Sequence, residues 1–405
     1  MPITRNSPAA AHLLDVTRTV RRAGYRPTGI DRAERAYIAH LVACPTPLFG
    51  LVRTKLGYLL LDKKGCAALL AHCDTPKWQN ADLLSKLSGS SDTPRAATES
   101  GLRKIAVDRA TAARLRPLLQ RHLPSGAVYL NVGQTNFNDR LIHALRACDT
   151  LRIAVYLHDT IPLDWPDLQT QKSRLKFKRL FDRVDRHADL VLCNSQDTKM
   201  TALRHARGLT EDKVHVIWPG LPEIDPGHPP KGPWTDKPYF MAIGTIEPRK
   251  NIGFLLDMWE DFREPDSPHL LICGRRGWLS EDVFARLDNQ PGHVHELPDL
   301  PDPAMWALLK NSCGLLFPSI VEGFGYPAME AAHLGVPVIC NALPSVKEVL
   351  DDYPIYADSS DSYLWMHNIK QLAQGRRGQS GEQLSTEVVE TPDWQAHFNR
   401  LFTIL

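Results

Sequence analysis

Two glutamates, Glu322 and Glu330, flank a glycine-rich turn in the last third of the chain. The sequence from 317 to 330 reads Phe-Pro-Ser-Ile-Val-Glu-Gly-Phe-Gly-Tyr-Pro-Ala-Met-Glu. Backbone N–H groups from Gly323 to Gly325, together with the start of the following helix, form a seat for anionic oxygens. A carboxylate beside such a seat accepts hydrogen bonds from sugar hydroxyls instead. Either glutamate alone is typical of a solvated helix residue or a charge near the helix dipole.

A strand, a loop, a helix and a second strand must position this pair. Leu315 to Phe317 predict the end of a buried strand, and Pro327 to Leu334 predict a short helix with proline in its first turn. Gly335 is placed to be its left-handed cap, and Val336 to Cys340 predict the next strand. This is a βαβ unit whose loop opens at the carboxyl end of a strand, where open parallel sheets hold ligands.

A second motif follows the predicted strand Tyr239 to Gly244 and reads Thr-Ile-Glu-Pro-Arg-Lys-Asn from 245 to 251. Arg249 and Lys250 are adjacent cations at a strand-to-helix turn. An arginine grips two oxygens and a lysine supplies a compact charge, so the two residues can clamp a diphosphate. As a solvated turn, the motif would need no ligand.

The two motifs together resemble glycosyltransferase family 4, whose members are retaining, nucleotide-sugar-dependent enzymes of the GT-B fold. The resemblance rests on the Glu-x7-Glu spacing around Gly-Phe-Gly-x-Pro and on Gly-Thr-x-Glu-Pro-Arg-Lys-Asn, and it is strongest from Tyr239 to Tyr356. It implies that Glu322 holds the hydroxyls of the donor sugar and Glu330 those of the ribose. Arg249 and Lys250 would stabilise the departing diphosphate.

The same resemblance assigns further residues to the nucleotide-sugar site: Gly323, Phe324, Gly325, Gly244 and Thr245. Some family members carry an arginine directly after the first glycine of the donor motif, where this chain has Thr245. The charge there would fall to Arg249 and Lys250.

Three weaker resemblances add candidates. His158 and Asp159 end the predicted strand that begins at Leu151, where the family has a histidine near the donor sugar and phosphate. Gly274 and Arg275 follow another strand, whose end lines the base and ribose pocket in the family. Gly29 lies in a Gly-Ile-x-Arg opening near the family's acceptor cleft. A histidine at a strand end is more often structural than catalytic, so His158 depends on the resemblance.

With 405 residues, the chain exceeds what one hydrophobic core fills. The predicted fold class is α/β, GT-B, with two Rossmann-like domains facing a central cleft. The expected division is an acceptor-side domain over 1–221, a proline- and glycine-rich linker over 222–237, and a nucleotide-sugar domain over 238–390. A C-terminal helix over 391–405 is expected to pack back on the first domain.

Composition limits the partners and the compartment. A formal net charge of +2 argues against a nucleic-acid binder driven by bulk charge. The eight cysteines include no Cys-x-x-Cys and predict reduced thiols, and no run of 18 apolar residues occurs. The protein is expected in the cytoplasm. A basic helix over 172–187 is read as an ordinary packed helix, with contact to the inner membrane or an acidic glycan as the alternative.

The expected activity is transfer of a sugar from a nucleoside-diphosphate sugar, GDP-mannose for example, to a glycan or lipid-linked acceptor in bacterial polysaccharide assembly. No cofactor and no metal are expected, because no Asp-x-Asp lies in either cleft segment and fixed cations can replace a metal. One alternative is a non-catalytic sugar-nucleotide-binding partner of an assembly complex. Another is a GT-B sugar-nucleotide epimerase or phosphorylase.

The first half of the chain gives weaker patterns. The stretch 88–101 is polar and predicts a loop, and 102–123 predicts one helix. Strands are predicted at 12–16, 47–62, 127–131, 188–195 and 214–220.

Overall fold

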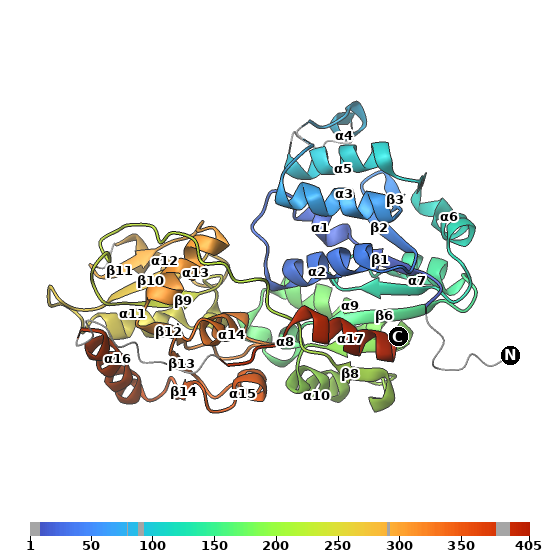
Figure 1. Ribbon diagram of the computed structural model, residues 1–405. Helices are drawn as coiled ribbons and strands as arrows, with labels where there is room; N and C mark the ends of the chain where they lie inside the picture. The colour runs from blue at the N-terminus through green and yellow to red at the C-terminus, as the bar shows by residue number, and fades with distance from the viewer. Residues whose placement is uncertain (1–8, 79, 88–92, 290–291, 378–388) are drawn as a thin grey trace.

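The computed structural model describes residues 9–78, 80–87, 93–289, 292–377 and 389–405. These residues form two lobes that lie side by side, each built on one sheet with helices on both faces (Figure 1). We call the lobe that contains residues 9–217 domain 1 and the lobe that contains residues 239–377 domain 2.

The sheet of domain 1 has the strand order β4-β3-β2-β1-β5-β6-β7-β8. All neighbours are parallel except β2 with β3 and β3 with β4, which are antiparallel. Apolar side chains cover both faces, as expected of a mainly parallel sheet, and form two separate clusters. The strands are β1 (His12–Asp15), β2 (Leu48–Thr54), β3 (Gly57–Leu61), β4 (Asp108–Ala110), β5 (Val128–Asn131), β6 (Arg152–Leu157), β7 (Leu190–Cys193) and β8 (Val214–Val216).

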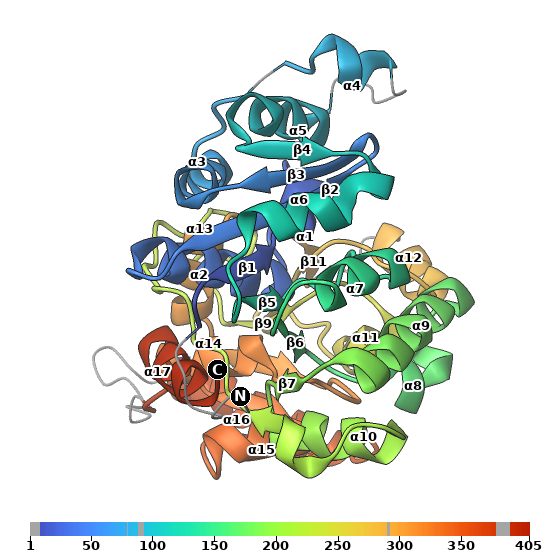
Figure 2. The same ribbon diagram turned by 90° about the vertical axis from the view of Figure 1, so that its right-hand side faces the viewer.

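Helices of domain 1 flank this sheet, and α4 lies at its far tip, beyond α5 (Figures 1 and 2). They are α1 (Thr17–Arg21), α2 (Gly29–Ala43), α3 (Lys63–Asp74), α4 (Leu83–Leu87), α5 (Pro94–Ile105), α6 (Leu115–His122), α7 (Asp139–Arg146), α8 (Ile161–Asp164), α9 (Gln171–His187) and α10 (Gln196–His205), with 3-10 turns at Ala112–Arg114, Pro166–Leu168 and Glu211–Lys213. On α9, Phe181 and Val184 are buried while Lys172, Lys176 and Arg179 are exposed.

Domain 2 carries a fully parallel sheet of order β11-β10-β9-β12-β13-β14. Its strands are β9 (Tyr239–Ile243), β10 (His269–Cys273), β11 (Val294–Glu296), β12 (Gly314–Phe317), β13 (Val338–Cys340) and β14 (Ile355–Tyr356). Its helices are α11 (Ile252–Trp259), α12 (Glu281–Asp288), α13 (Asp302–Asn311), α14 (Tyr326–His333), α15 (Pro344–Leu350) and α16 (Ser362–Arg377), with a 3-10 turn at Pro248–Lys250.

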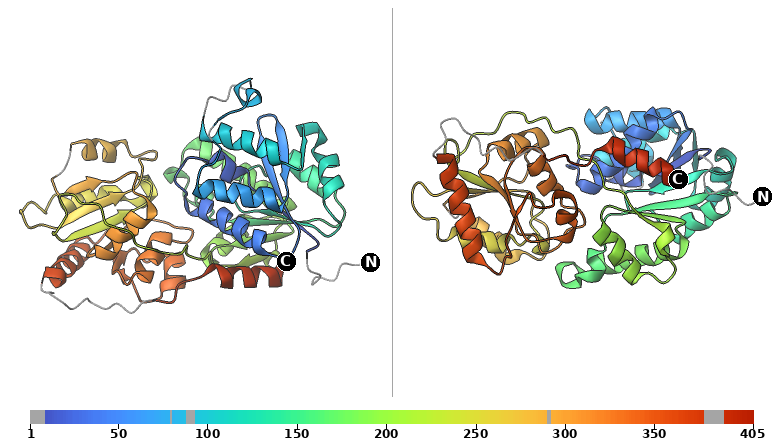
Figure 3. Two further views of the ribbon diagram at one scale, coloured as in Figure 1. Left: turned by 45° about the horizontal axis from the view of Figure 1, so that its top comes forward. Right: turned by 60° about the horizontal axis from the view of Figure 1, so that its bottom comes forward.

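The chain crosses between the domains twice. The outward segment, 218–238, packs along domain 2, where Trp234 is buried and the Gly227 N–H donates to the Pro303 carbonyl. After domain 2 the chain returns to α17 (Trp394–Ile404), which lies against domain 1 in both views of Figure 3. Phe398 of α17 is buried there, in contact with Tyr37. The two crossings touch, because the Leu221 N–H donates to the Pro392 carbonyl at 2.9 Å.

The local predictions hold around α14 and fail on one edge of domain 1. Gly335 has φ 67°, as the predicted left-handed cap requires. The loop predicted over 88–101 is wrong from Pro94 onward, where α5 begins, and its residues 88–92 lie outside the described residues. The single helix predicted over 102–123 is also wrong, since β4 interrupts it.

Candidate functional site

The loop between β12 and α14 lies where the two domains meet. Gly323 packs so closely on domain 1 that a Cβ there would come within 2.1 Å of the His158 carbonyl oxygen. Gly325 has φ 94° and precedes the first turn of α14, a conformation that disfavours other residues. Phe324 between them is buried, with its ring edge-on to Tyr326. The loop therefore needs glycine at position 323 because the two domains approach closely there, and at position 325 because the backbone has a positive φ.

Glu322 forms an ion cluster with the basic motif of the same domain. Its carboxylate lies 2.5 Å from Arg249 Nη1 and 2.6 Å from Lys250 Nζ. Arg249 also contacts Glu247, with 2.7 Å between Nε and Oε1. Lys250 lies over the Phe317 ring, 4.8 Å from its centroid. We call Glu247, Arg249, Lys250 and Glu322 the Glu322 cluster; its two cations and two carboxylates balance.

Burial and pairing oppose each other in this cluster. Burial alone would raise the pKa of Glu322, but Arg249 and Lys250 outweigh it and lower that pKa to about 2. Burial lowers the pKa of Lys250, against the attraction of Glu322. Burial also raises the pKa of Glu247, against Arg249 and Lys250. Glu322 is therefore ionised and held in place at neutral pH.

Two candidate glycines bring strand ends of domain 2 together beneath this cluster. Gly244 has φ 138°, and a Cβ there would lie 2.9 Å from Lys250 Cε. A Cβ at Gly274 would lie 1.8 Å from the Gly244 carbonyl oxygen. Thr245 follows, with its methyl group against Gly277. Arg275 instead pairs with Asp299 at 2.6 Å, and half of its side chain is exposed. It is therefore not part of the Glu322 cluster.

Glu330 does not share the surroundings of Glu322. It is buried, and its Oε1 lies 2.6 Å from Nη1 of Arg32, a residue of α2 in domain 1. Arg32 also binds Asp302 of α13 at 2.7 Å, as does Arg26. We call Arg26, Arg32, Asp302 and Glu330 the bridging cluster, because it joins the two domains. Burial raises the pKa of Glu330, and Arg32 opposes that rise.

Gly29 lies beside this bridging cluster, at the start of α2. A Cβ on it would lie 3.0 Å from the ring of Tyr326, the first residue of α14. The resemblance placed Gly29 near the acceptor cleft, and in this structure its neighbour is the helix that carries Glu330. The bridging pairs therefore close the space between α2 and α14.

His158 and Asp159 end β6 and face the Gly323 loop. The buried His158 ring donates from Nε2 to the Val132 carbonyl at 2.8 Å, and burial lowers its pKa to about 4. Burial raises the pKa of Asp159 to about 6, opposed by Arg249. Asp159 accepts a hydrogen bond from the Ile161 N–H at 3.1 Å. His158 is thus a neutral, fixed ring whose main chain meets the loop of domain 2.

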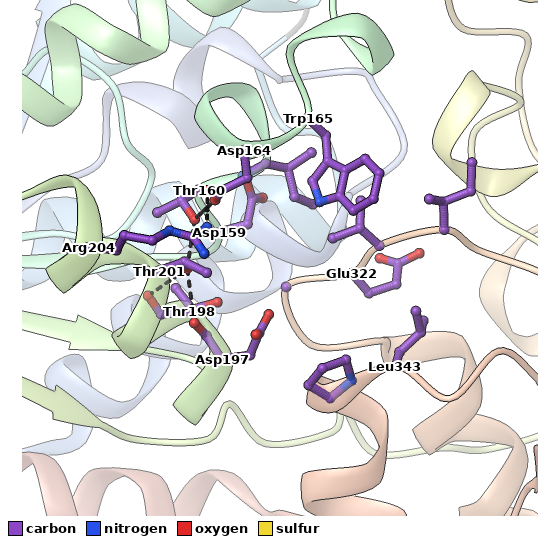
Figure 4. Close-up of a pocket in the computed structure, with 15 residues that line it drawn as sticks. Asp159, Thr160, Asp164, Trp165, Asp197, Thr198, Thr201, Arg204, Glu322 and Leu343 are labelled. Atoms are coloured by element: carbon purple, nitrogen blue, oxygen red, sulfur yellow. Dashed lines mark hydrogen bonds and ion pairs between the residues drawn. The ribbon is translucent and has the colours of Figure 1, made fainter.

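A cavity of about 270 Å³ lies between the domains beside Glu322. Figure 4 shows Trp165 and Glu322 on one side of it and Asp197 on the other. Among the candidates from the sequence, Asp159, Glu322 and Gly323 line this cavity, whereas Glu330, Arg249 and Lys250 do not. Within the described residues, no group of three or more His, Cys, Asp or Glu side chains is placed to hold a metal ion.

Sequence reasoning missed several residues of this region. Glu247 lies in the quoted motif but was given no role, and Arg32 ends the Gly-Ile-x-Arg opening, so a local signal existed for both. Asp302, Trp165 and Asp197 stand in no motif that we identified, and only the tertiary structure brings them to the cleft.

Solved structures share this two-domain architecture. The crystal structure of Anabaena Alr3699/HepE with UDP-glucose superposes with a TM-score of 0.59 at 15% identity, covering 91% of this chain and 90% of that one. WaaG, a glycosyltransferase involved in lipopolysaccharide biosynthesis, gives a TM-score of 0.55 at 12% identity, covering 96% and 99%. The fold class is GT-B, and the prediction of two Rossmann-like domains is confirmed.

Within that architecture, residues 226–377 match the family described as Glycosyl transferases group 1. O-antigen chain mannosyltransferase B of Escherichia coli is 36% identical over 132 residues, 30% of this chain and 33% of that protein. O-antigen chain mannosyltransferase RfbU of Salmonella typhimurium is 26% identical over 227 residues, 54% of this chain and 60% of that protein. The chain spans about a third of the length of the first relative and less than two thirds of the second. Residues 226–377, which include domain 2, are thus similar to the glycosyl transferases group 1 family, and parts of the chain are similar to O-antigen mannosyltransferases.

No described helix combines the length and the apolar character needed to span a bilayer.

Proposed function

We propose that the protein is a retaining glycosyltransferase of family 4 that moves a hexose from a nucleoside-diphosphate sugar to a glycan or lipid-linked acceptor in polysaccharide assembly. The observation that carries the proposal is the Glu322 cluster, which lies inside the group 1 domain and at its carboxyl strand ends. The mannosyltransferase relatives support mannose as the donor sugar. GDP as its carrier is part of the proposal and is tested below.

The cluster contains the groups that the reaction needs. Glu322, held ionised, accepts hydrogen bonds from donor sugar hydroxyls and places the anomeric carbon. Arg249 and Lys250 face the leaving diphosphate. Because both are balanced by carboxylates here, a bound diphosphate must exchange with one of those carboxylates as a partner. Transition-state charge then falls on cations that are already fixed in position, a large source of rate enhancement.

No metal is required in this proposal, since the two cations and the N-terminus of α14 supply positive charge where a diphosphate departs. Transfer should therefore survive EDTA. Abolition by EDTA with rescue by Mg²⁺ or Mn²⁺ would show that a metal carries the charge instead.

The first experiment identifies the donor by thermal shift against UDP, GDP, dTDP and ADP sugars. A ligand at ~100 times its Kd adds about 2.7 kcal/mol to the free energy of unfolding. Turnover is then measured with the sugar that binds, and NMR of the product's anomeric proton should show an α linkage from an α-linked donor. A β linkage would remove the retaining assignment.

Glu322→Gln separates catalysis from binding. We expect it to lower turnover far more than nucleotide affinity, because the glutamine keeps the shape and loses the charge. Nucleotide binding with no turnover in the native protein would instead support the non-catalytic binding partner, and conversion of the free nucleotide sugar would support an epimerase.

The proposed site of action is the cytoplasmic face of the inner membrane, with α9 as the contact. The exposed basic residues of α9 include Lys172, Lys176 and Arg179, beside the half-exposed Leu175. Co-sedimentation with vesicles of anionic and of zwitterionic lipid tests this: binding to both or to neither contradicts an electrostatic contact.

A further inference from the structure

The cavity beside Glu322 is built from both domains, and among its lining residues only Glu322 and Gly323 have a role in the proposed transfer. Domain 1 supplies the segment after β6 and the start of α10, and domain 2 supplies residues 320–323 and 343–344. Its volume of about 270 Å³ is near the lower end of ligand pockets, roughly 300 to 1,000 Å³. The size suits one sugar ring rather than an extended chain.

Apolar surface lies on two sides of this cavity. Trp165 is 44% exposed although it lies between the domains, and its ring lines the space next to Glu322 (Figure 4). Domain 2 contributes Ile320, Val321 and Leu343. A pyranose ring has C–H faces and hydroxyl edges, so a flat aromatic surface beside aliphatic walls matches its faces.

Hydrogen-bond acceptors lie between these surfaces. The Asp197 carboxylate has no ion-pair or hydrogen-bond partner among the described residues, and burial raises its pKa. Asp159 Oδ1 accepts from the Ile161 N–H, and its other oxygen has no hydrogen-bond partner among the described residues. Asp164 is already engaged by Arg204 and His205, and Glu322 by its own cluster. The unused groups are therefore carboxylates, which accept from hydroxyls and repel anions.

We infer that this cavity is a subsite for one uncharged sugar residue of the acceptor. Trp165 stacks on the sugar ring, and the Asp197 carboxylate accepts a hydrogen bond from one of its hydroxyl groups. The inference rests on the proposed function, in which Arg249 and Lys250 contact the donor diphosphate. Because neither residue lines the cavity, the cavity is assigned to the acceptor. An acceptor whose first contact is a phosphate or uronate does not fit this space.

The experiment titrates the full chain with four probes, followed by saturation-transfer NMR: methyl α-D-mannopyranoside, methyl α-D-glucopyranoside, methyl α-D-glucuronide and inorganic phosphate. No donor is needed. The variants are Trp165→Ala, Trp165→Phe and Asp197→Asn, with Tyr363→Ala as control because Tyr363 is an exposed aromatic (81%) of domain 2. We expect a neutral glycoside to bind, a loss of tenfold or more in Trp165→Ala and Asp197→Asn, and retention within about threefold in Trp165→Phe and the control.

Transfer kinetics give an independent readout. With a donor identified, Trp165→Ala and Asp197→Asn should raise the KM for the acceptor about tenfold, with little change in the donor KM. An unchanged acceptor KM, or displacement of the neutral glycoside by phosphate or glucuronide, overturns the subsite and leaves the transferase proposal intact. Absence of any transfer overturns the proposed function, whereas glycoside binding is measured without it.

Discussion

Glu322 and Glu330 lie on one short stretch of chain, yet cations of different origin neutralise them. Arg249 and Lys250, which pair with Glu322, belong to the same domain, while Arg32, which pairs with Glu330, belongs to the other domain. The Glu322 cluster is therefore complete inside domain 2 whatever the angle between domains. The bridging cluster exists only where the domains touch. The first arrangement suits fixed catalytic charges, and the second suits a contact that opens to admit a ligand.

The largest effect should come from removing a cation of the Glu322 cluster. We expect Lys250→Ala to lower turnover by about 10²- to 10³-fold, the loss seen when one preorganised donor is deleted. Lys347→Ala is the matched control, because Lys347 is an exposed lysine of the same domain. Steady-state rates with saturating donor check this. A loss below fivefold in Lys250→Ala would show that Lys250 does not face the leaving group.

Acid should affect the two glutamates in opposite directions. The pKa of Glu322 is lowered from 4.5 to about 2, so its contribution to stability is present above pH 4.5 and is lost as pH falls toward 2. The shift corresponds to about 3 kcal/mol in the free energy of unfolding. The pKa of Glu330 is raised, so protonation of that carboxyl as pH falls increases the free energy of unfolding of the protein.

Urea unfolding between pH 6 and 2.5 checks this difference. Glu322→Gln should flatten the decline in the free energy of unfolding below pH 4.5, and Glu330→Gln should leave that decline in place. Equal slopes in the two variants would mean that the Glu322 carboxylate is not held by its cations in solution.

A smaller effect is expected at the bridging cluster. If Glu330 binds ribose hydroxyls, Arg32 competes with the nucleotide for it, so Arg32→Ala should tighten nucleotide binding by up to about tenfold, 1.4 kcal/mol. Glu330→Ala should weaken binding. Arg35→Ala, on the same helix, is the control. Isothermal titration with the nucleotide found by thermal shift measures all three, and weaker binding in Arg32→Ala would indicate that the bridge supports the site.

The smallest effect should come from Arg26. Its pair with Asp302 is partly exposed, and such pairs contribute about 0.2 to 1 kcal/mol. Arg26→Ala should therefore change the free energy of unfolding by less than about 1 kcal/mol. Urea unfolding at two salt concentrations checks this, since screening weakens an exposed pair.

Local pattern predicts domain 2 better than the outer edge of domain 1. Around α14 the signals agree: apolar strands, a glycine loop, proline in the first turn and Gly335 at the end. On α5, the side chains that face inward include Thr98, Glu99 and Ser100, and they are buried by hydrogen bonds rather than by apolar packing. The buried residues of this helix are mostly small or polar, so the local pattern predicts a loop there.

The candidate site likewise has one part that the sequence predicts and another that it does not. The sequence predicts that Arg249, Lys250 and Glu322 act at one place, and the structure brings both cations within hydrogen-bonding distance of Glu322. The pairing of Arg32 with Glu330 joins residues 298 positions apart on different domains. No local spacing encodes such a contact, because it depends on how two separately folded sheets meet.

The double crossing near Leu221 and Pro392 limits the mechanical freedom of the molecule. A single connecting segment permits both bending and swivelling of the domains, because rotation about a bond in it breaks no other contact. Here the two crossing segments are joined by a hydrogen bond. Gly220 lies so close to Trp394 that a Cβ on Gly220 would come within 2.3 Å of the Trp394 backbone nitrogen. Swivelling would shear these contacts, whereas bending keeps them. We therefore expect bending about the paired crossing, which widens and narrows the cleft, to be easier than swivelling.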